Sequence, residues 1–259
     1  MQDQLNIALI QADLVWENPT KNRENFTQKI ESISSKKDLV VLPEMFTTGF
    51  TMNAKQFAEP MTGETVCWMQ HLAKKTQAAI VGSLIILENN NFYNRLLFIT
   101  PDGSIEYYNK RHSFSLVGEN KVYTSGEKKL IITYKGWRIC PLICYDLRFP
   151  VWARNTENYD VLLYVANWPK TRISAWDTLL KARAIENMCY SIGVNRVGTD
   201  GLKSEYPGHS AIYNVLGAEI AFCPNTKEGI EIVTLDKKHI TAYRNKLNFL
   251  NDKDTFTIN

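Results

Sequence analysis

The sequence predicts an α/β layered fold, on the strength of two observations. Short runs of apolar and β-branched residues, such as residues 39–42, alternate with stretches whose apolar residues recur at helical spacing, such as residues 63–77. Tight turns, as at residues 101–103, join some of the predicted strands, and helical crossovers join others. This combination indicates sheets of mixed direction that are covered by helices.

The predicted elements follow one another along the whole chain. Residues 5–11 form a first strand, a helix covers residues 19–34, and the continuous apolar run 39–42 is typical of a strand buried on both faces. The other strands are predicted over residues 79–87, 94–100, 104–109, 130–134, 137–143, 161–166, 190–196, 208–213, 219–222 and 229–235. The other helices are predicted over residues 63–77, 174–189 and 236–246.

Length and composition place the chain among ordinary globular proteins. It has 259 residues, of which 44% are hydrophobic and 22% charged, so it can bury a core without disulfides. No linker or short repeat divides it. We therefore expect one domain over residues 1–259, with a core over about residues 4–236 and a C-terminal helix and tail over residues 237–259.

Charge and cysteine content limit the partners and the location that we expect. A net charge of +3 is too weak to favour nucleic acid or an anionic membrane as a partner. No apolar run is long enough for a membrane span, and the residues after Met1 lack the basic region of a signal peptide. The odd count of 5 cysteines indicates reduced thiols and a cytoplasmic protein.

Three of the predicted strands lead directly into a reactive side chain, namely Glu44, Lys110 and Cys144. In α/β sheets, sites gather beyond the carboxyl ends of the strands. A thiol nucleophile, a cation that lowers its pKa and a carboxylate that accepts its proton would together suit acyl transfer. A polar residue at the end of a single strand is more often simply solvated, so the inference depends on all three being present.

Six segments that contain these residues resemble the nitrilase, or carbon–nitrogen hydrolase, superfamily, in its order and approximate spacing. They are Leu-Pro-Glu-Met-Phe at 42–46, Tyr-Asn-Lys-Arg-His at 108–112, Ile-Cys-Tyr-Asp-Leu-Arg-Phe-Pro at 143–150, Tyr-Val-Ala-Asn-Trp-Pro at 164–169, Lys-Ala-Arg-Ala-Ile-Glu-Asn at 181–187 and Asn-Arg-Val-Gly at 195–198. The resemblance runs from about residue 4 to residue 236. In detail, the segments look most like the bacterial omega-amidase branch, which hydrolyses 2-oxoglutaramate and related omega-amides of short dicarboxylates.

The resemblance implies a role for each reactive residue. Glu44 would be the general base, and Cys144 would attack the amide carbon and form a thioester with release of ammonia. Lys110 would stabilise the oxyanion together with the backbone N–H of Tyr145. Glu119, in the long loop over residues 113–126, is the best match for the family's second glutamate, with Glu127 nearby as the alternative.

The resemblance also implies an architecture and an assembly. The family fold is a four-layer αββα sandwich in which two mixed sheets pack face to face, and its members commonly pair, so a homodimer or larger homo-oligomer is implied. No cofactor is implied. The 4 histidines lack the spacing of a zinc site, so we expect no metal.

Residues near these motifs are candidates for binding substrate. Arg148 has two open interpretations: a structural ion pair with Asp146, or a bidentate contact to the carboxylate at the far end of the substrate. Phe46, Tyr145 and Asn167 are further candidates to line the pocket. Trp168 is equally compatible with the pocket and with core packing.

Other functions remain open. An N-carbamoyl amidohydrolase and a true nitrilase would share the Glu–Lys–Cys set and differ in pocket shape, which the sequence does not reveal. A non-catalytic dimeric scaffold protein on the same fold is the alternative from another class, and the presence of Glu44, Lys110 and Cys144 argues against it.

Overall fold

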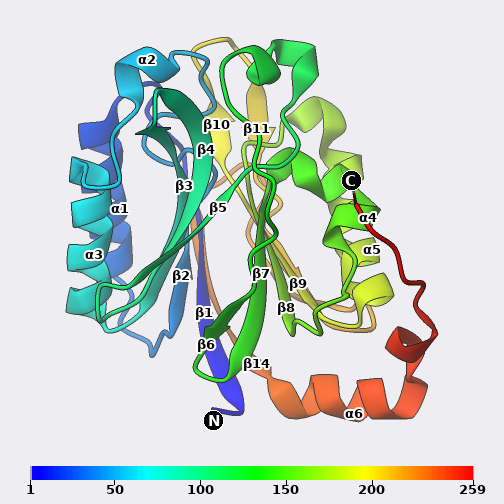
Figure 1. Cartoon of the computed structure of the whole chain (residues 1–259). Helices are drawn as coiled ribbons and strands as arrows, with labels where there is room; N and C mark the ends of the chain where they lie inside the picture. The colour runs from blue at the N-terminus through cyan, green and yellow to red at the C-terminus, as the bar shows by residue number, and fades with distance from the viewer. Residues whose placement is uncertain (1, 259) are drawn as a thin grey trace.

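Two six-stranded mixed sheets form the centre of the computed structural model, which describes residues 2–258 (Figure 1). The first sheet has the strand order β14-β1-β2-β3-β4-β5, and the second has the order β13-β12-β9-β8-β7-β6. The strands of the first sheet are β1 (Gln4–Gln11), β2 (Leu39–Val41), β3 (Ala79–Glu88), β4 (Asn91–Ile99), β5 (Ile105–Asn109) and β14 (Gly229–Asp236). Those of the second are β6 (Ile132–Tyr134), β7 (Trp137–Ile143), β8 (Val161–Ala166), β9 (Tyr190–Asn195), β12 (Ala211–Tyr213) and β13 (Glu219–Phe222).

Helices cover the outer face of each sheet. In Figure 1, α1 (Pro19–Glu31) and α3 (Glu64–Thr76) lie outside the first sheet, and α4 (Pro150–Ala153) and α5 (Ile173–Asn187) lie outside the second. The helix α6 (Lys237–Leu247) follows β14 at the opposite end of the sheets from α2 (Ala54–Phe57). This arrangement is the four-layer αββα sandwich that the resemblance implied.

The apolar pattern of the first sheet explains why it is buried on both faces. Successive side chains of a strand point to opposite faces. In β1, Leu5, Ile7 and Leu9 pack in the core between the two sheets, whereas Ala8 and Ile10 pack under the outer helices. A strand covered on both sides needs a continuous apolar run rather than an alternating one, which is the pattern that the sequence shows.

The structure differs from the sequence-based expectations mainly at the ends of elements and in elements of three or four residues. The helix α1 ends at Glu31 instead of residue 34, and β12 begins three residues later than expected because Gly208 and His209 have positive φ angles. The strands β10 (Val197–Thr199) and β11 (Glu205–Pro207), which form a separate two-stranded sheet, were not expected, nor were α2 and α4. Within residues 2–258, no helix is both long and apolar enough to cross a membrane.

Candidate active site

The ends of β2, β5 and β7 bring three reactive side chains to the wall of one cavity. Glu44 follows β2, Lys110 follows β5 directly, and Cys144 follows β7 directly. The strands β2 and β5 belong to the first sheet and β7 belongs to the second, so the site lies where the two sheets meet.

A buried ion cluster surrounds the ammonium group of Lys110. Its Nζ lies 3.0 Å from Glu44 Oε1, and 2.9 and 3.0 Å from the two carboxylate oxygens of Glu119. All three residues are at most 3% exposed. The loop therefore brings Glu119, rather than the exposed Glu127, against Lys110.

The electrostatics of this cluster keep the lysine charged. Burial alone would lower the pKa of Lys110, but the charges of Glu119 and Glu44 outweigh burial and raise it. Burial raises the pKa of Glu119 above its usual value, because the opposing effect of Lys110 is smaller. A permanently charged ammonium group beside the thiol is suited to stabilising negative charge that develops on a substrate oxygen.

Hydrogen bonds fix the orientation of the Glu44 carboxylate. Oε1 accepts a hydrogen bond from Asn94 Nδ2 at 2.7 Å as well as from Lys110, and Oε2 accepts one from the backbone N–H of Asn167 at 2.9 Å. The side-chain amide of Asn167 also donates to the backbone carbonyl of Glu44 at 2.6 Å. These hydrogen bonds hold the carboxylate in one position. A group that exchanges protons with a thiol must be held in this way.

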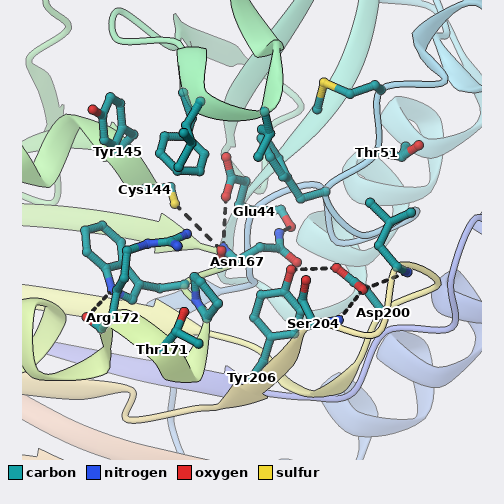
Figure 2. Close-up of a pocket in the computed structure, with 18 of the residues that line it drawn as sticks. Glu44, Thr51, Cys144, Tyr145, Asn167, Thr171, Arg172, Asp200, Ser204 and Tyr206 are labelled. Carbon is teal, nitrogen blue, oxygen red and sulfur yellow. Dashed lines mark hydrogen bonds between the residues drawn. The ribbon is translucent and has the colours of Figure 1, made fainter.

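Cys144 lies on a strained turn at the end of β7. Its φ angle is +45°, a conformation that is uncommon for residues other than glycine, and its Sγ lies 4.0 Å from the backbone carbonyl oxygen of Asn167 (Figure 2). Burial raises the pKa of the Cys144 thiol well above its usual range, and the charge of Glu44 raises it further, against the lowering effect of Lys110. The charge of Lys110 lowers the thiol pKa, as the sequence analysis expected, but the effect of burial is larger, so the net shift is upward.

Asp146 has a different role from the expected ion pair with Arg148. One carboxylate oxygen accepts hydrogen bonds from the Tyr108 hydroxyl at 2.8 Å and from the Ile143 N–H at 3.0 Å, and the other contacts the backbone N–H and ring Nδ1 of His112. No ion pair between Asp146 and Arg148 forms in the described part of the chain. Asp146 therefore fixes the turn that carries Cys144, and Arg148 is left free to face the cavity.

The cavity has a volume of about 990 Å³ and opens beside the cysteine (Figure 2). Of the predicted pocket residues, Tyr145, Arg148, Asn167 and Trp168 line it. The guanidinium group of Arg148 lies over the Trp168 ring, 5.0 Å from the ring centroid. Trp168 is only 3% exposed, so it belongs to both the core and the pocket wall.

Phe46 does not line this cavity, and the expectation that it does is corrected. Its ring is fully buried in the core under the outer helices, where it contacts the rings of Phe26 and Trp68. Phe46 lies two residues beyond Glu44 in the motif, but its side chain points away from the thiol toward α1 and α3.

The sequence reasoning missed three residues of this site. Asn94 is a buried polar residue directly before the buried Arg95 in strand β4, and two polar residues in front of the apolar run 96–99 are a signal that could have been noticed. Phe114 and Arg172 both line the cavity. The centroids of the Phe114 and Tyr145 rings are 4.9 Å apart. Neither Phe114 nor Arg172 interrupts a pattern in the sequence that would have marked it.

Comparisons of the sequence and of the fold with known proteins point to the same family. The sequence profile of the carbon-nitrogen hydrolase family matches residues 6–245. The chain is 43% identical to omega-amidase YafV of Yersinia enterocolitica, with 98% of each chain covered, and 32% identical to 2-oxoglutaramate amidase of Bacillus subtilis, with 95% of this chain and 96% of the relative covered. The crystal structure of XC1258 from Xanthomonas campestris, a CN-hydrolase superfamily protein with an arsenic adduct in its active site, superposes with a TM-score of 0.97 at 40% identity and full coverage of both chains.

Proposed function

Because this chain belongs to the carbon–nitrogen hydrolase family, we propose that it is an omega-amidase. It would hydrolyse the terminal amide of a short dicarboxylate monoamide, such as 2-oxoglutaramate, 2-oxosuccinamate or succinamate, to the dicarboxylate and ammonia. The relatives named omega-amidase and 2-oxoglutaramate amidase support this choice of substrate. The observation that carries the proposal is a cavity that holds the buried pair Glu44 and Lys110, the half-buried Cys144 and an arginine with no ion-pair partner in residues 2–258.

The first half of the reaction forms a thioester. Glu44 accepts the proton of the Cys144 thiol as the sulfur attacks the amide carbon, and the carbonyl oxygen becomes an oxyanion. Lys110 stabilises this oxyanion together with the N–H of Tyr145, which lies at the start of the 3₁₀ turn Cys144–Arg148, where backbone N–H groups lack helical partners. When the carbon–nitrogen bond breaks, protonated Glu44 gives its proton to the nitrogen, and ammonia leaves.

The second half of the reaction hydrolyses the thioester. Glu44, again ionised, takes a proton from a water molecule that attacks the thioester carbon, and the same donors stabilise the second oxyanion. Collapse of this intermediate releases the dicarboxylate, and the proton on Glu44 returns to the Cys144 sulfur. Glu119 holds the Lys110 ammonium group in place throughout, because both of its oxygens contact Nζ.

Arg148 would orient the substrate. Its guanidinium group is four residues from the nucleophile on the same turn and makes no ion pair in residues 2–258, while the Trp168 ring supports it. A guanidinium group binds a carboxylate through two parallel hydrogen bonds. Arg148 would therefore hold the far carboxylate of the substrate and leave the terminal amide at Cys144.

The test is ammonia release from 2-oxoglutaramate and from succinamate by the wild type and by Cys144→Ala. Turnover by the wild type that is lost in a folded Cys144→Ala variant supports both the activity and the nucleophile. Turnover of N-carbamoyl amino acids or nitriles, with none of the omega-amides, would replace this proposal by one of the alternative activities on the same fold.

Two further properties are part of the proposal. A single-domain homodimer or larger homo-oligomer is supported by exposed apolar side chains on and beside α5, such as Ile185 and Leu216, and light scattering of the purified protein tests it. A cytoplasmic location is supported by the absence of a disulfide among the 5 cysteines, all of which lie within residues 2–258.

A further inference from the structure

Three cations on the wall of the cavity beside Cys144 have no ion-pair or hydrogen-bond partner within residues 2–258. Within residues 2–258, every carboxylate on the cavity wall has a polar partner. Glu44 contacts Lys110, Glu17 contacts Thr51 and Asn53, Asp200 contacts Tyr206, and Glu205 contacts Lys170. The charged side chains of the wall that make no ion pair or hydrogen bond in this part of the chain are all cations: Arg148, Arg172 and Lys203. These three cations are therefore available to an anionic or polar group of a ligand.

Both arginines lie over aromatic rings, and this contact leaves their hydrogen-bond donors free. The guanidinium carbon of Arg148 lies 5.0 Å from the centroid of the Trp168 ring, and that of Arg172 lies 5.0 Å from the centroid of the Phe114 ring. A cation–π contact restrains the position of a guanidinium group without using its N–H groups. Each arginine can thus offer its planar set of donors to a ligand at a reduced entropic cost.

The two arginines belong to the same part of the wall. Trp168, which supports Arg148 with its ring, also donates a hydrogen bond from Nε1 to the backbone carbonyl of Arg172 at 2.8 Å. Phe114, which supports Arg172, contacts the ring of Tyr145, the residue after the nucleophile. In Figure 2, Cys144 and Arg172 lie on one side of the cavity and Asp200 lies on the other.

From this arrangement we propose that Arg172 is a specificity-determining residue that binds the 2-oxo oxygen of the substrate, next to the carboxylate that Arg148 holds. One guanidinium group engages a carboxylate through two parallel hydrogen bonds, so a second one on the same wall is available to an acceptor beside that carboxylate. In a 2-oxo acid, a carbonyl oxygen adjoins the carboxylate and provides that acceptor. The inference rests on the proposed function and deepens it, because it makes 2-oxo omega-amides the preferred substrate class.

Calorimetric binding of two ligands that differ by one oxygen atom tests the proposal without turnover. The ligands are 2-oxoglutarate, the product of 2-oxoglutaramate hydrolysis, and glutarate, which lacks only the 2-oxo oxygen. The wild type is expected to bind 2-oxoglutarate more tightly than glutarate. Arg172→Met, which keeps an unbranched side chain of similar length without the guanidinium group, is expected to weaken 2-oxoglutarate binding by about 10- to 100-fold, as for a hydrogen bond to a charged donor, and glutarate binding by less than about threefold.

Two further variants separate a specific contact from a general effect of charge. Lys203→Met removes another unpaired cation from the same wall, in the turn between β10 and β11, and should leave the ratio of the two affinities unchanged. Arg172→Lys keeps the charge but loses the planar fork, so it should lose most of the preference, and it serves as the test if Arg172→Met fails to fold.

Three results would overturn the proposal: equal affinity of the wild type for both ligands, no binding of either ligand, or an equal loss for both ligands in Arg172→Met. Because binding does not depend on hydrolysis, a preserved binding preference without ammonia release would refute the proposed function and leave this inference in place. Ammonia release without the binding preference would do the opposite.

Discussion

Replacing Lys110 by methionine tests whether the buried ion cluster is as tightly coupled as its geometry indicates. The ammonium group makes three contacts of 2.9–3.0 Å with Glu44 and Glu119, and all three side chains are at most 3% exposed. Lys110→Met leaves two carboxylates buried without their cation, which costs about 3–5 kcal/mol when one partner of a buried pair is removed. With an unfolding entropy of about 2.1 cal/mol/K per residue, this corresponds to a fall in Tm of about 6–9 °C.

The pH dependence of the loss gives a sharper test than its size. Burial and the charge of Glu44 both raise the pKa of Glu119, and in Lys110→Met the opposing charge of the lysine is gone. A raised pKa in the folded state means that folded Glu119 keeps a proton that the unfolded chain releases above a pH of about 4.3. The stability of the variant is therefore highest at low pH and falls as the pH rises through the folded-state pKa, so the Tm deficit should be smaller at about pH 5.5 than at about pH 8.

Two companion variants complete the thermal unfolding assay. In Lys110→Met/Glu119→Gln one unpaired charge is gone, so part of the Tm lost at the higher pH should return. Lys170→Met breaks the exposed pair with Glu205, whose side chains are 63% and 60% exposed, and should leave the Tm unchanged. A Tm of Lys110→Met within about 2 °C of the wild type at the higher pH, or a deficit independent of pH, would refute the reasoning.

Three other substitutions probe separate parts of the site. Glu44→Gln removes a charge that raises the thiol pKa, so the pKa of Cys144, followed by thiolate absorbance in a pH titration, should fall, while kcat falls by about 10²–10⁴-fold for lack of a base. A thiol pKa that rises, or an unchanged kcat, would contradict the assignment. Arg148→Lys should raise KM for amides that carry a carboxylate by about tenfold and leave neutral amides nearly unchanged, since lysine lacks the planar fork, whereas an equal loss would exclude a carboxylate contact. Asp146→Ala should lower the free energy of unfolding by about 1–3 kcal/mol for each donor left unpaired, and Asp146→Asn should lower it by less. Denaturant unfolding measures both losses, and equal losses for the two variants would argue against the hydrogen-bond network.

The sequence predicted the buried strands well because their composition leaves little choice. Strands β7 and β8 have the expected bounds, and β1 begins one residue earlier than expected. The strands β10 and β11 were missed because they are three residues long and polar at several positions, so neither shows a period that distinguishes it from a loop. The resemblance, and not periodicity, indicated two sheets packed face to face.

The site was predictable where it depends on strand ends and unpredictable where it depends on loops. Glu44, Lys110 and Cys144 each follow a predicted strand, so a general rule about sheets suggested that they gather at one edge, and the resemblance supplied their roles. Arg172 is in a connection between β8 and α5 without a pattern, and only packing places it against the ring of Phe114. Phe46 was misplaced because proximity in the chain says nothing about the face to which a side chain points.

The site lies between two sheets, and this location explains why the sequence pattern of single strands could not predict the pKa shifts of its groups. The groups of the site come from two different sheets, and hydrogen bonds between the sheets set their relative positions. Glu44, which follows β2 of the first sheet, is hydrogen-bonded to Asn167, which follows β8 of the second. Tyr108 in β5 is hydrogen-bonded to Asp146, which follows β7. The pKa of the Cys144 thiol depends on how close Glu44 and Lys110 lie to the sulfur and on how completely the packing excludes water. A strand pattern indicates which side chains reach the sheet edge, but only the packing of one sheet on the other sets the opposing effects of burial and of Lys110 on the pKa of the Cys144 thiol.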